Sequence, residues 1–92
     1  MTKQDFVNKF YPAAKAAGAE FNINPVVVLA QAAIESGWGE SKLSSYNNFF
    51  GITAYGRINN YWHGGKIQLA EGGLTFRRYD TMENSFMDYC RL

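Results

Sequence analysis

The run from Val26 to Gly37, VVVLAQAAIESG, constrains the fold of this chain more than any other segment. Ten consecutive positions favour a helix and nearly all are apolar, so we expect this helix to be buried on most sides. Gln31 and Glu35 interrupt the apolar pattern, and their i, i+4 spacing places them on one face. A carboxylate is costly to bury unless it is paired, neutralised or used, so Glu35 is the first candidate for chemistry.

Helical patterns precede and follow this segment. Apolar residues at three- and four-residue steps predict a helix over about residues 3–21, which Pro12 should bend or split. Asn24 and Pro25 suit an N-cap and a first helical position, so the apolar helix should span about residues 25–37.

The second half of the chain predicts a small β-structure and a last helix. Alternating residues around Ala70-Glu71-Gly72-Gly73 indicate a β-hairpin over about residues 66–79. Asp80 should cap a helix over about residues 81–92. With 92 residues, the sequence therefore predicts one small α+β domain, 1–92, that is mainly α.

Charge and composition exclude several classes of function. The formal net charge is +1 and the basic residues are scattered, which argues against nucleic-acid binding. Cys90 and His63 are the only residues of their types, so we expect no disulfide, no metal site and no cofactor. No signal peptide is visible, and no apolar run approaches a membrane-spanning length.

The surroundings of Glu35 suit a catalytic acid. Its helical neighbours Ala32, Ala33 and Ile34 are apolar, and apolar surroundings favour the protonated form of a carboxyl group. A protonated acid in a cleft can protonate a leaving oxygen. The plainer alternative is an ion pair between Glu35 and a cation such as Lys42 or Arg77, and the spacing alone leaves both open.

Four sequence blocks point to a family: Leu29–Ser41 (LAQAAIESGWGES), Asn47–Ile52 (NNFFGI), Phe76–Asp80 (FRRYD) and Glu83–Tyr89 (ENSFMDY). In this order they resemble the glycoside hydrolase family 73 glucosaminidases, which include flagellar muramidase domains and bacterial autolysins. The resemblance implies a lysozyme-like helical fold with a small β-hairpin lobe. It also implies hydrolysis of the β-1,4 bond after N-acetylglucosamine in peptidoglycan, with Glu35 matching the catalytic acid.

The second catalytic group is less defined. Many family members carry a second acidic residue on the β-lobe, where Glu71 is the only carboxylate of this chain; Asp80 is a further candidate. An inverting mechanism needs a base about 6.5–9.5 Å from the acid, whereas a substrate acetamido group could replace that base. The resemblance also places Tyr79 near the cleft as a catalytic candidate. Arg77 is interpreted as structural, holding the hairpin through a carboxylate or carbonyls.

Aromatic and amide residues suit a sugar-binding groove, because pyranose rings pack on aromatic rings and N-acetyl groups need amide partners. Aromatic side chains of the segment 53–65 are expected to be exposed in such a groove. The candidates for contact with the sugar are Gln31, Trp38, Asn48, Tyr55, Tyr61 and Trp62.

These observations favour a peptidoglycan hydrolase that acts on glycan strands of the bacterial cell wall, in the periplasm or outside the cell. Two alternatives stay open: a glycan-binding module without turnover, and a lytic transglycosylase that uses one acid and no water. Domains of this family usually continue beyond the position matching Leu92. We therefore expect one wall of the fold to be missing, or to be supplied by a partner chain, including through self-association.

Overall fold

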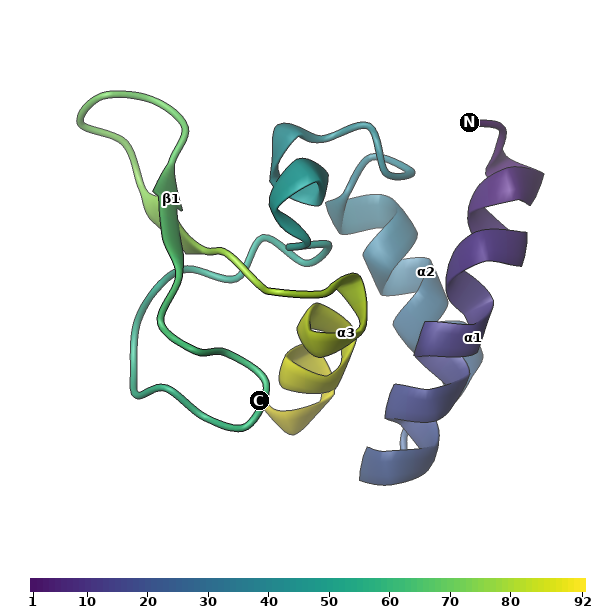
Figure 1. Ribbon diagram of the computed structural model, residues 1–92. Coiled ribbons are helices and arrows are strands. Elements are labelled where there is room, and N and C mark those ends of the chain that lie inside the picture. The colour runs from purple at the N-terminus through teal and green to yellow at the C-terminus, as the bar shows by residue number, and fades with distance from the viewer.

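The computed structural model describes all residues, 1–92, and is built mainly from helices. The elements are α1 (Lys3–Phe21), α2 (Pro25–Glu35), the short 3₁₀ helix η1 (Lys42–Tyr46), β1 (Lys66–Gln68), β2 (Thr75–Arg77) and α3 (Met82–Arg91). The helices lie together and the hairpin projects from them (Figure 1). The predicted mainly helical α+β class is confirmed.

Helix α1 is continuous from end to end. It opens with a capping box, in which Thr2 accepts from the backbone of Asp5 and the Asp5 side chain accepts from Thr2. Pro12 does not split the helix, contrary to the prediction. Pro12 lies on the exposed side, and Asn8, whose carbonyl loses its helical partner there, is also exposed to water.

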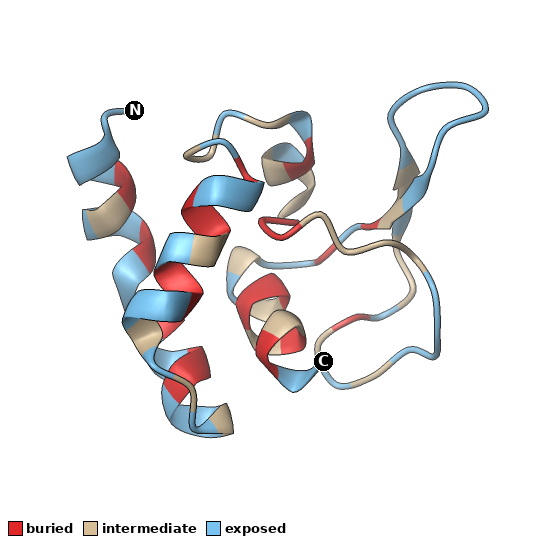
Figure 2. Ribbon diagram, turned by 180° about the vertical axis from the view of Figure 1, so that it is seen from behind, coloured by how far each residue is buried: buried red, intermediate tan, exposed pale blue.

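Helix α2 is less buried than its composition predicts. Only one face is buried, by Val28, Leu29, Ala32 and Ala33, while Val26, Val27 and Ile34 are each more than half exposed. The expectation of burial on most sides is therefore wrong, because neighbouring helices cover one face only (Figure 2). The helix also ends at Glu35 rather than Gly37, since Gly37 and Trp38 both adopt a φ of +57°.

Aromatic rings join α1, α3 and the loop after η1 in one core. Phe10 of α1 lies 4.7 Å from Phe49, centroid to centroid, and Phe50 lies 5.0 Å from Phe86 of α3. The buried faces of the helices point toward this core (Figure 2). The loop after η1 thus contributes Phe49 and Phe50 to the core, which holds that loop against the helices.

The small sheet is extended by the segment that follows this loop. β1 and β2 are antiparallel, with Ile67 opposite Phe76. Thr53 forms an isolated bridge to Phe76, and the Arg77 backbone N–H donates to the Ile52 carbonyl at 2.9 Å. The chain therefore passes directly from the core loop into the β-lobe.

Helix α3 begins one residue later than predicted and has a different cap. Thr81 is the N-cap, and its hydroxyl accepts from the Asn84 backbone N–H at 3.2 Å. The prediction that Asp80 caps this helix is wrong, because its carboxylate binds His63 Nδ1 at 2.6 Å instead.

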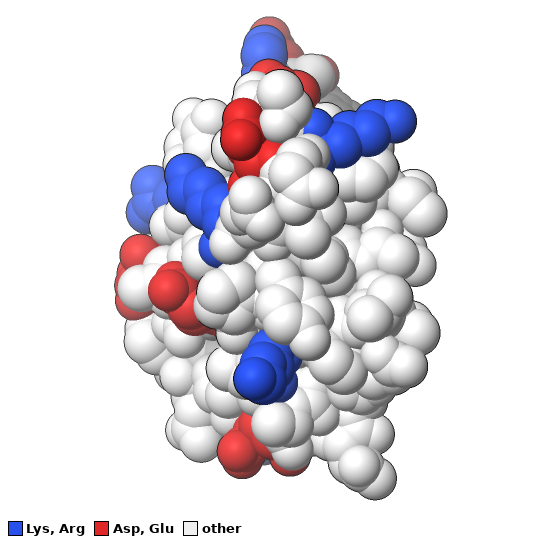
Figure 3. Space-filling model, turned by 90° about the vertical axis from the view of Figure 1, so that its right-hand side faces the viewer, with Lys and Arg blue, Asp and Glu red and all other residues white.

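The surface carries scattered charges of both signs. On the face turned toward the viewer in Figure 3, basic and acidic side chains are interspersed over a mostly uncharged surface. None of the helices combines the length and the apolar character that crossing a lipid bilayer requires.

Candidate active site

Glu35 occupies the last position of α2, beside a turn of unusual backbone geometry. The i, i+4 spacing brings Gln31 to it, and Gln31 Nε2 donates to Glu35 Oε1 at 2.9 Å. Ser36 anchors the following turn, since its buried hydroxyl accepts from the Gly39 backbone N–H at 2.9 Å. The carboxylate is thus oriented by one amide at a rigid helix end.

No cation neutralises Glu35 in this structure. Neither Lys42 nor Arg77 forms an ion pair with it, and Arg77 is buried and bound elsewhere. The partial burial predicted for Glu35 is also absent, because its residue is exposed. Glu35 therefore presents an exposed carboxylate that has no cation partner and can contact a ligand.

An apolar groove begins next to the Glu35 carboxylate. It has a volume of about 480 Å³ and lies between Val27 and Val28 of α2, the loop 50–53, and Tyr89 and Cys90 of α3. Gly51 lines this groove, and Glu35 Oε2 would lie 3.9 Å from a Cβ at Gly51. A side chain there would adopt a strained φ of +64°, so this position beside the carboxylate favours glycine.

Leu92, beyond which a partner chain is expected to cover the fold, lines this groove. Eight of its ten lining residues are hydrophobic. Self-association stays a prediction, which size-exclusion chromatography with light scattering would test.

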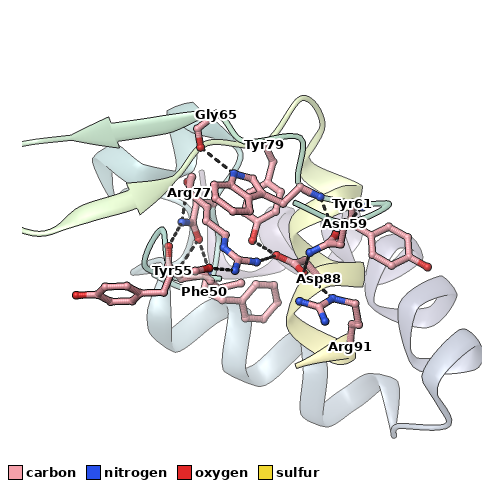
Figure 4. A network of polar contacts seen from close by, with 12 residues as sticks. Phe50, Tyr55, Asn59, Tyr61, Gly65, Arg77, Tyr79, Asp88 and Arg91 are labelled. Atoms are coloured by element: carbon pink, nitrogen blue, oxygen red, sulfur yellow. Dashed lines mark hydrogen bonds and ion pairs between the residues drawn. The ribbon is translucent and has the colours of Figure 1, made fainter. Parts of the chain in front are cut away.

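Asp88 connects the β-lobe to α3 and is the centre of a buried polar network (Figure 4). Its Oδ2 accepts from Arg77 Nη1 at 2.6 Å and from the Tyr79 hydroxyl. Its Oδ1 accepts from Asn59 Nδ2 at 3.1 Å and from Arg91 Nε at 3.0 Å. The network therefore joins β2, the loop around Asn59 and the last helix.

Arg77 has the structural role that the sequence predicts. It donates through Nη1 to the Asp88 carboxylate and through Nη2 to the Tyr55 carbonyl. Its guanidinium also lies over the ring of Trp62, 4.2 Å from the centroid. These contacts hold the β-lobe to the helical body.

Burial and hydrogen bonding determine the ionisation of this network. Burial, reinforced by the hydrogen bond to Asp88, raises the pKa of Tyr79 well above its usual range. Burial alone would raise the pKa of Asp88, but hydrogen bonds from Tyr79, Arg77 and Arg91 outweigh it and lower that pKa. Asp88 is therefore ionised and Tyr79 neutral near pH 7.

Tyr79 is buried, and its hydroxyl is committed to Asp88. A catalytic role for Tyr79 stays a prediction, and in this conformation its hydroxyl orders the network. Sequence reasoning did not single out Asp88. The available signal was the spacing of Asp88, the second carboxylate of the ENSFMDY block, three residues after Ser85, which is buried on the same helix.

Asn48 was predicted to bind sugar but is instead occupied within the loop. Its side chain is 1% exposed, and its Nδ2 donates to the carbonyls of Ile52 and Arg77 at 3.0 and 2.9 Å. Its Oδ1 accepts from the backbone N–H groups of Phe50 and Ile52. No donor or acceptor remains free for a ligand, so Asn48 shapes the loop that carries Gly51.

The predicted sugar-binding aromatics do not gather in one groove. Trp62 is 2% exposed, which corrects the expectation of an exposed ring. Tyr61 is half-buried with its ring edge-on to Phe21. Trp38 packs against Phe6 of α1. Only Tyr55 is largely exposed.

The candidates for a second catalytic carboxylate form no hydrogen bond with Glu35. Glu71 is exposed in the turn between β1 and β2, at the tip of the hairpin that projects away from the helices (Figure 1). Asp80 is paired with His63, and that hydrogen bond raises the pKa of the imidazole. Their catalytic roles stay predictions.

Comparison with known proteins shows which protein family this chain matches. The family model for glucosaminidase, described as mannosyl-glycoprotein endo-beta-N-acetylglucosaminidase, matches residues 11–92. A peptidoglycan hydrolase FlgJ of Vibrio parahaemolyticus is 32% identical over 102 residues, which cover 96% of this chain and 32% of that protein. The chain thus spans about a third of the length of this curated relative.

Solved structures share the fold. The glycoside hydrolase domain of Salmonella typhimurium FlgJ is 26% identical and has a TM-score of 0.77, covering 99% of this chain and 60% of that one. The catalytic domain of the autolysin Auto from Listeria monocytogenes is also 26% identical, with a TM-score of 0.73 over 97% of this chain and 54% of that one. The fold expected from the four sequence blocks is confirmed.

Proposed function

Because this chain belongs to the glucosaminidase family, we propose that it hydrolyses peptidoglycan at the β-1,4 bond after N-acetylglucosamine, with Glu35 as the general acid. The substrate is a glycan strand of the bacterial cell wall, so the proposed place of action is the periplasm or the cell exterior. Curated relatives carry the name peptidoglycan hydrolase, which supports this substrate.

The position of Glu35 is the single observation that carries the proposal. Its carboxylate is exposed, has no cation partner, is oriented by Gln31, and stands beside a glycine that lines the apolar groove. A glycan over Gly51 and the exposed Ile34 would exclude water from the carboxyl group. Removal of water favours the protonated form, which is the form that a general acid needs.

The acid acts on the leaving sugar. A protonated Glu35 donates its proton to the glycosidic oxygen as the bond from that oxygen to the anomeric carbon breaks. The leaving sugar departs with a new hydroxyl group, and Glu35 becomes a carboxylate. That carboxylate can then accept a proton from the water that attacks the other fragment.

We assign the nucleophile to the substrate rather than to the protein. Glu71 lies in the exposed turn between β1 and β2, and Asp80 is hydrogen-bonded to His63, so neither contacts Glu35. The acetamido oxygen of the cleaved N-acetylglucosamine can attack the anomeric carbon and form a cyclic intermediate, which water opens. Two displacements at one carbon predict products that retain the anomeric configuration.

Replacement of the acid tests the proposal. Glu35→Gln keeps a side-chain oxygen that can accept the hydrogen bond from Gln31, but it removes the acidic proton. The variant should therefore lower the release of reducing sugar from purified sacculi at least ~100-fold. Glu20→Gln, at an exposed glutamate of α1 that forms no ion pair, is the matched control. Thermal unfolding should be unchanged in both. Full activity of Glu35→Gln would exclude Glu35 as the acid.

A non-catalytic glycan-binding module is the second candidate, favoured by the lack of a second carboxylate in contact with Glu35. It predicts that the chain sediments with sacculi but creates no reducing ends during a long incubation. A lytic transglycosylase also needs only one acid. Its 1,6-anhydro products would be lighter by one water in mass spectrometry, which separates it from a hydrolase.

A further inference from the structure

We propose that a second hollow of the molecule binds a carboxylate of the peptide stems that peptidoglycan glycan strands carry. The hollow has a volume of about 510 Å³ and lies between the loop 52–59 and the end of α3. Its lining includes Tyr55, Arg57, Arg77 and Arg91. The inference rests on the proposed substrate and adds the part of that substrate that is recognised outside the cleaved bond.

Positive charge predominates in this arginine hollow. Three guanidinium groups line it, whereas Asp88, the carboxylate behind them, is fully buried and bound to Arg77 and Arg91. Arg57 forms no ion pair, so its charge is not neutralised within the chain. An incoming anion would therefore meet unneutralised charge.

The free donors are those that recognise carboxylates. Arg57 is exposed and donates no hydrogen bond within the chain, and Arg91 uses only its Nε, toward Asp88. Arg77 is buried and already donates to Asp88 and to the Tyr55 carbonyl, so Arg57 and Arg91 are the arginines that can reach a ligand. The planar fork of a guanidinium matches the two oxygens of a carboxylate, and such charge-assisted bonds are stronger than neutral ones.

The hollow and the groove beside Glu35 share lining residues. Ile52 and Thr53 line both, and Gly51, next to the Glu35 carboxylate, precedes them in the chain. Arg57 follows Gly51 by six positions, so their Cα atoms are at most about 22 Å apart. An extended peptide advances about 3.3–3.6 Å per residue, so a stem peptide of a few residues can cover much of that distance.

The neighbourhood also suits the peptide that bears the carboxylate. The ring of Tyr55 and the side chain of Ile58 are mostly exposed at this hollow. They offer apolar surface to the aliphatic parts of a stem peptide, while Arg57 meets its anionic end. A neutral N-acetylglucosamine oligomer has no carboxylate, so the hollow should favour glycan that still carries peptide.

The test compares two substrates and two arginine variants. Soluble glycan fragments with intact stem peptides, and the same fragments stripped of peptide by an amidase, are titrated by calorimetry against Glu35→Gln, which prevents turnover. Adding Arg57→Gln should weaken the Kd for the peptide-bearing fragments about tenfold, equivalent to about 1.4 kcal/mol, and leave the peptide-free fragments unchanged. Arg78→Gln is the control, because Arg78 is an exposed arginine of the same lobe that forms no ion pair. It should leave the Kd values for both kinds of fragment unchanged.

The outcomes separate this inference from the proposed function. Equal Kd values for Arg57→Gln and its parent on peptide-bearing fragments, or an equal loss on both substrates, would overturn the inference. Wild-type protein that releases no reducing ends while the peptide-dependent effect of Arg57 persists would overturn the hydrolase proposal alone. The peptide-dependent difference should also shrink as salt rises, since Arg57 is exposed.

Discussion

A single amide organises the loop that places Gly51 beside Glu35. Asn48 uses both hydrogens of its Nδ2 and both acceptor positions of its Oδ1 on backbone groups of its own loop and of β2. An amide is suited to this task because it donates and accepts at adjacent atoms. The same property made Asn48 a plausible sugar ligand from sequence, and only its burial distinguishes the two roles.

We expect Asn48→Ala to lower the free energy of unfolding by about 3 kcal/mol, because each buried backbone group left without a partner costs about 1–3 kcal/mol. Asn60→Ala is the matched control, since its side chain is exposed and forms no hydrogen bond. Urea unfolding followed by circular dichroism measures both. A loss for Asn48→Ala no larger than for the control would contradict the assigned role.

At the scale of elements, the turn between α1 and α2 depends on close backbone approach. Gly18 lies within α1, where its carbonyl accepts from the Ile23 backbone N–H at 2.8 Å. A Cβ at Gly18 would lie 2.4 Å from the Ile23 carbonyl oxygen, inside any permitted contact. The glycine that weakens the helix in the sequence pattern is thus what allows α2 to begin beside the end of α1.

This geometry reverses the usual effect of a helical substitution. In an open helix, replacing glycine by alanine stabilises by about 1 kcal/mol. At Gly18 we expect Gly18→Ala to destabilise by about 1–3 kcal/mol, because the backbone of the turn must move. Thermal unfolding gives the sign directly, and a stabilised variant would refute the steric argument. Ala16→Gly, at an exposed site of the same helix, should destabilise by helix propensity alone.

At the scale of the whole molecule, Asp88 couples the two lobes and makes their association depend on pH. Its pKa is lowered in the folded protein by the bonds from Tyr79, Arg77 and Arg91, which outweigh its burial. The stability that it contributes is therefore fully present above the unfolded pKa of about 3.9 and is lost as the pH falls toward the lower folded pKa.

Replacing Asp88 should remove both the stability and its acid dependence. Asp88→Asn leaves Arg77 buried without its carboxylate, and we expect a loss of about 3–5 kcal/mol near pH 7. Below about pH 4 the difference from wild type should narrow, because Asp88 of the unfolded wild-type chain then binds a proton that the folded chain binds only at a lower pH. Denaturant unfolding from pH 3 to 7 measures this, with Glu83→Gln, exposed on the same helix, as control. A difference that is constant across this range would contradict the linkage.

The sequence alone determined the helices, the hairpin, the aromatic core stripe and the Gln31–Glu35 pair. Each of these depends on residues within a few positions of one another: the Thr2 cap, the Asn24-Pro25 start, and the four-residue step that joins Gln31 to Glu35. The sequence blocks likewise indicated the family, because they occur in the right order. Such local patterns do not need the rest of the fold.

The tertiary structure alone decided which side chains are buried and which groups their polar atoms contact. Val26, Val27 and Ile34 are exposed because only one face of α2 meets a neighbour, and no local pattern reports which face that is. The roles of Trp62, Asn48 and Asp88 depend on partners up to 29 residues away in the chain, such as Asn59 for Asp88. Whether a polar group binds a ligand or another part of the chain depends on which long-range groups reach it, and only the folded chain brings those groups together.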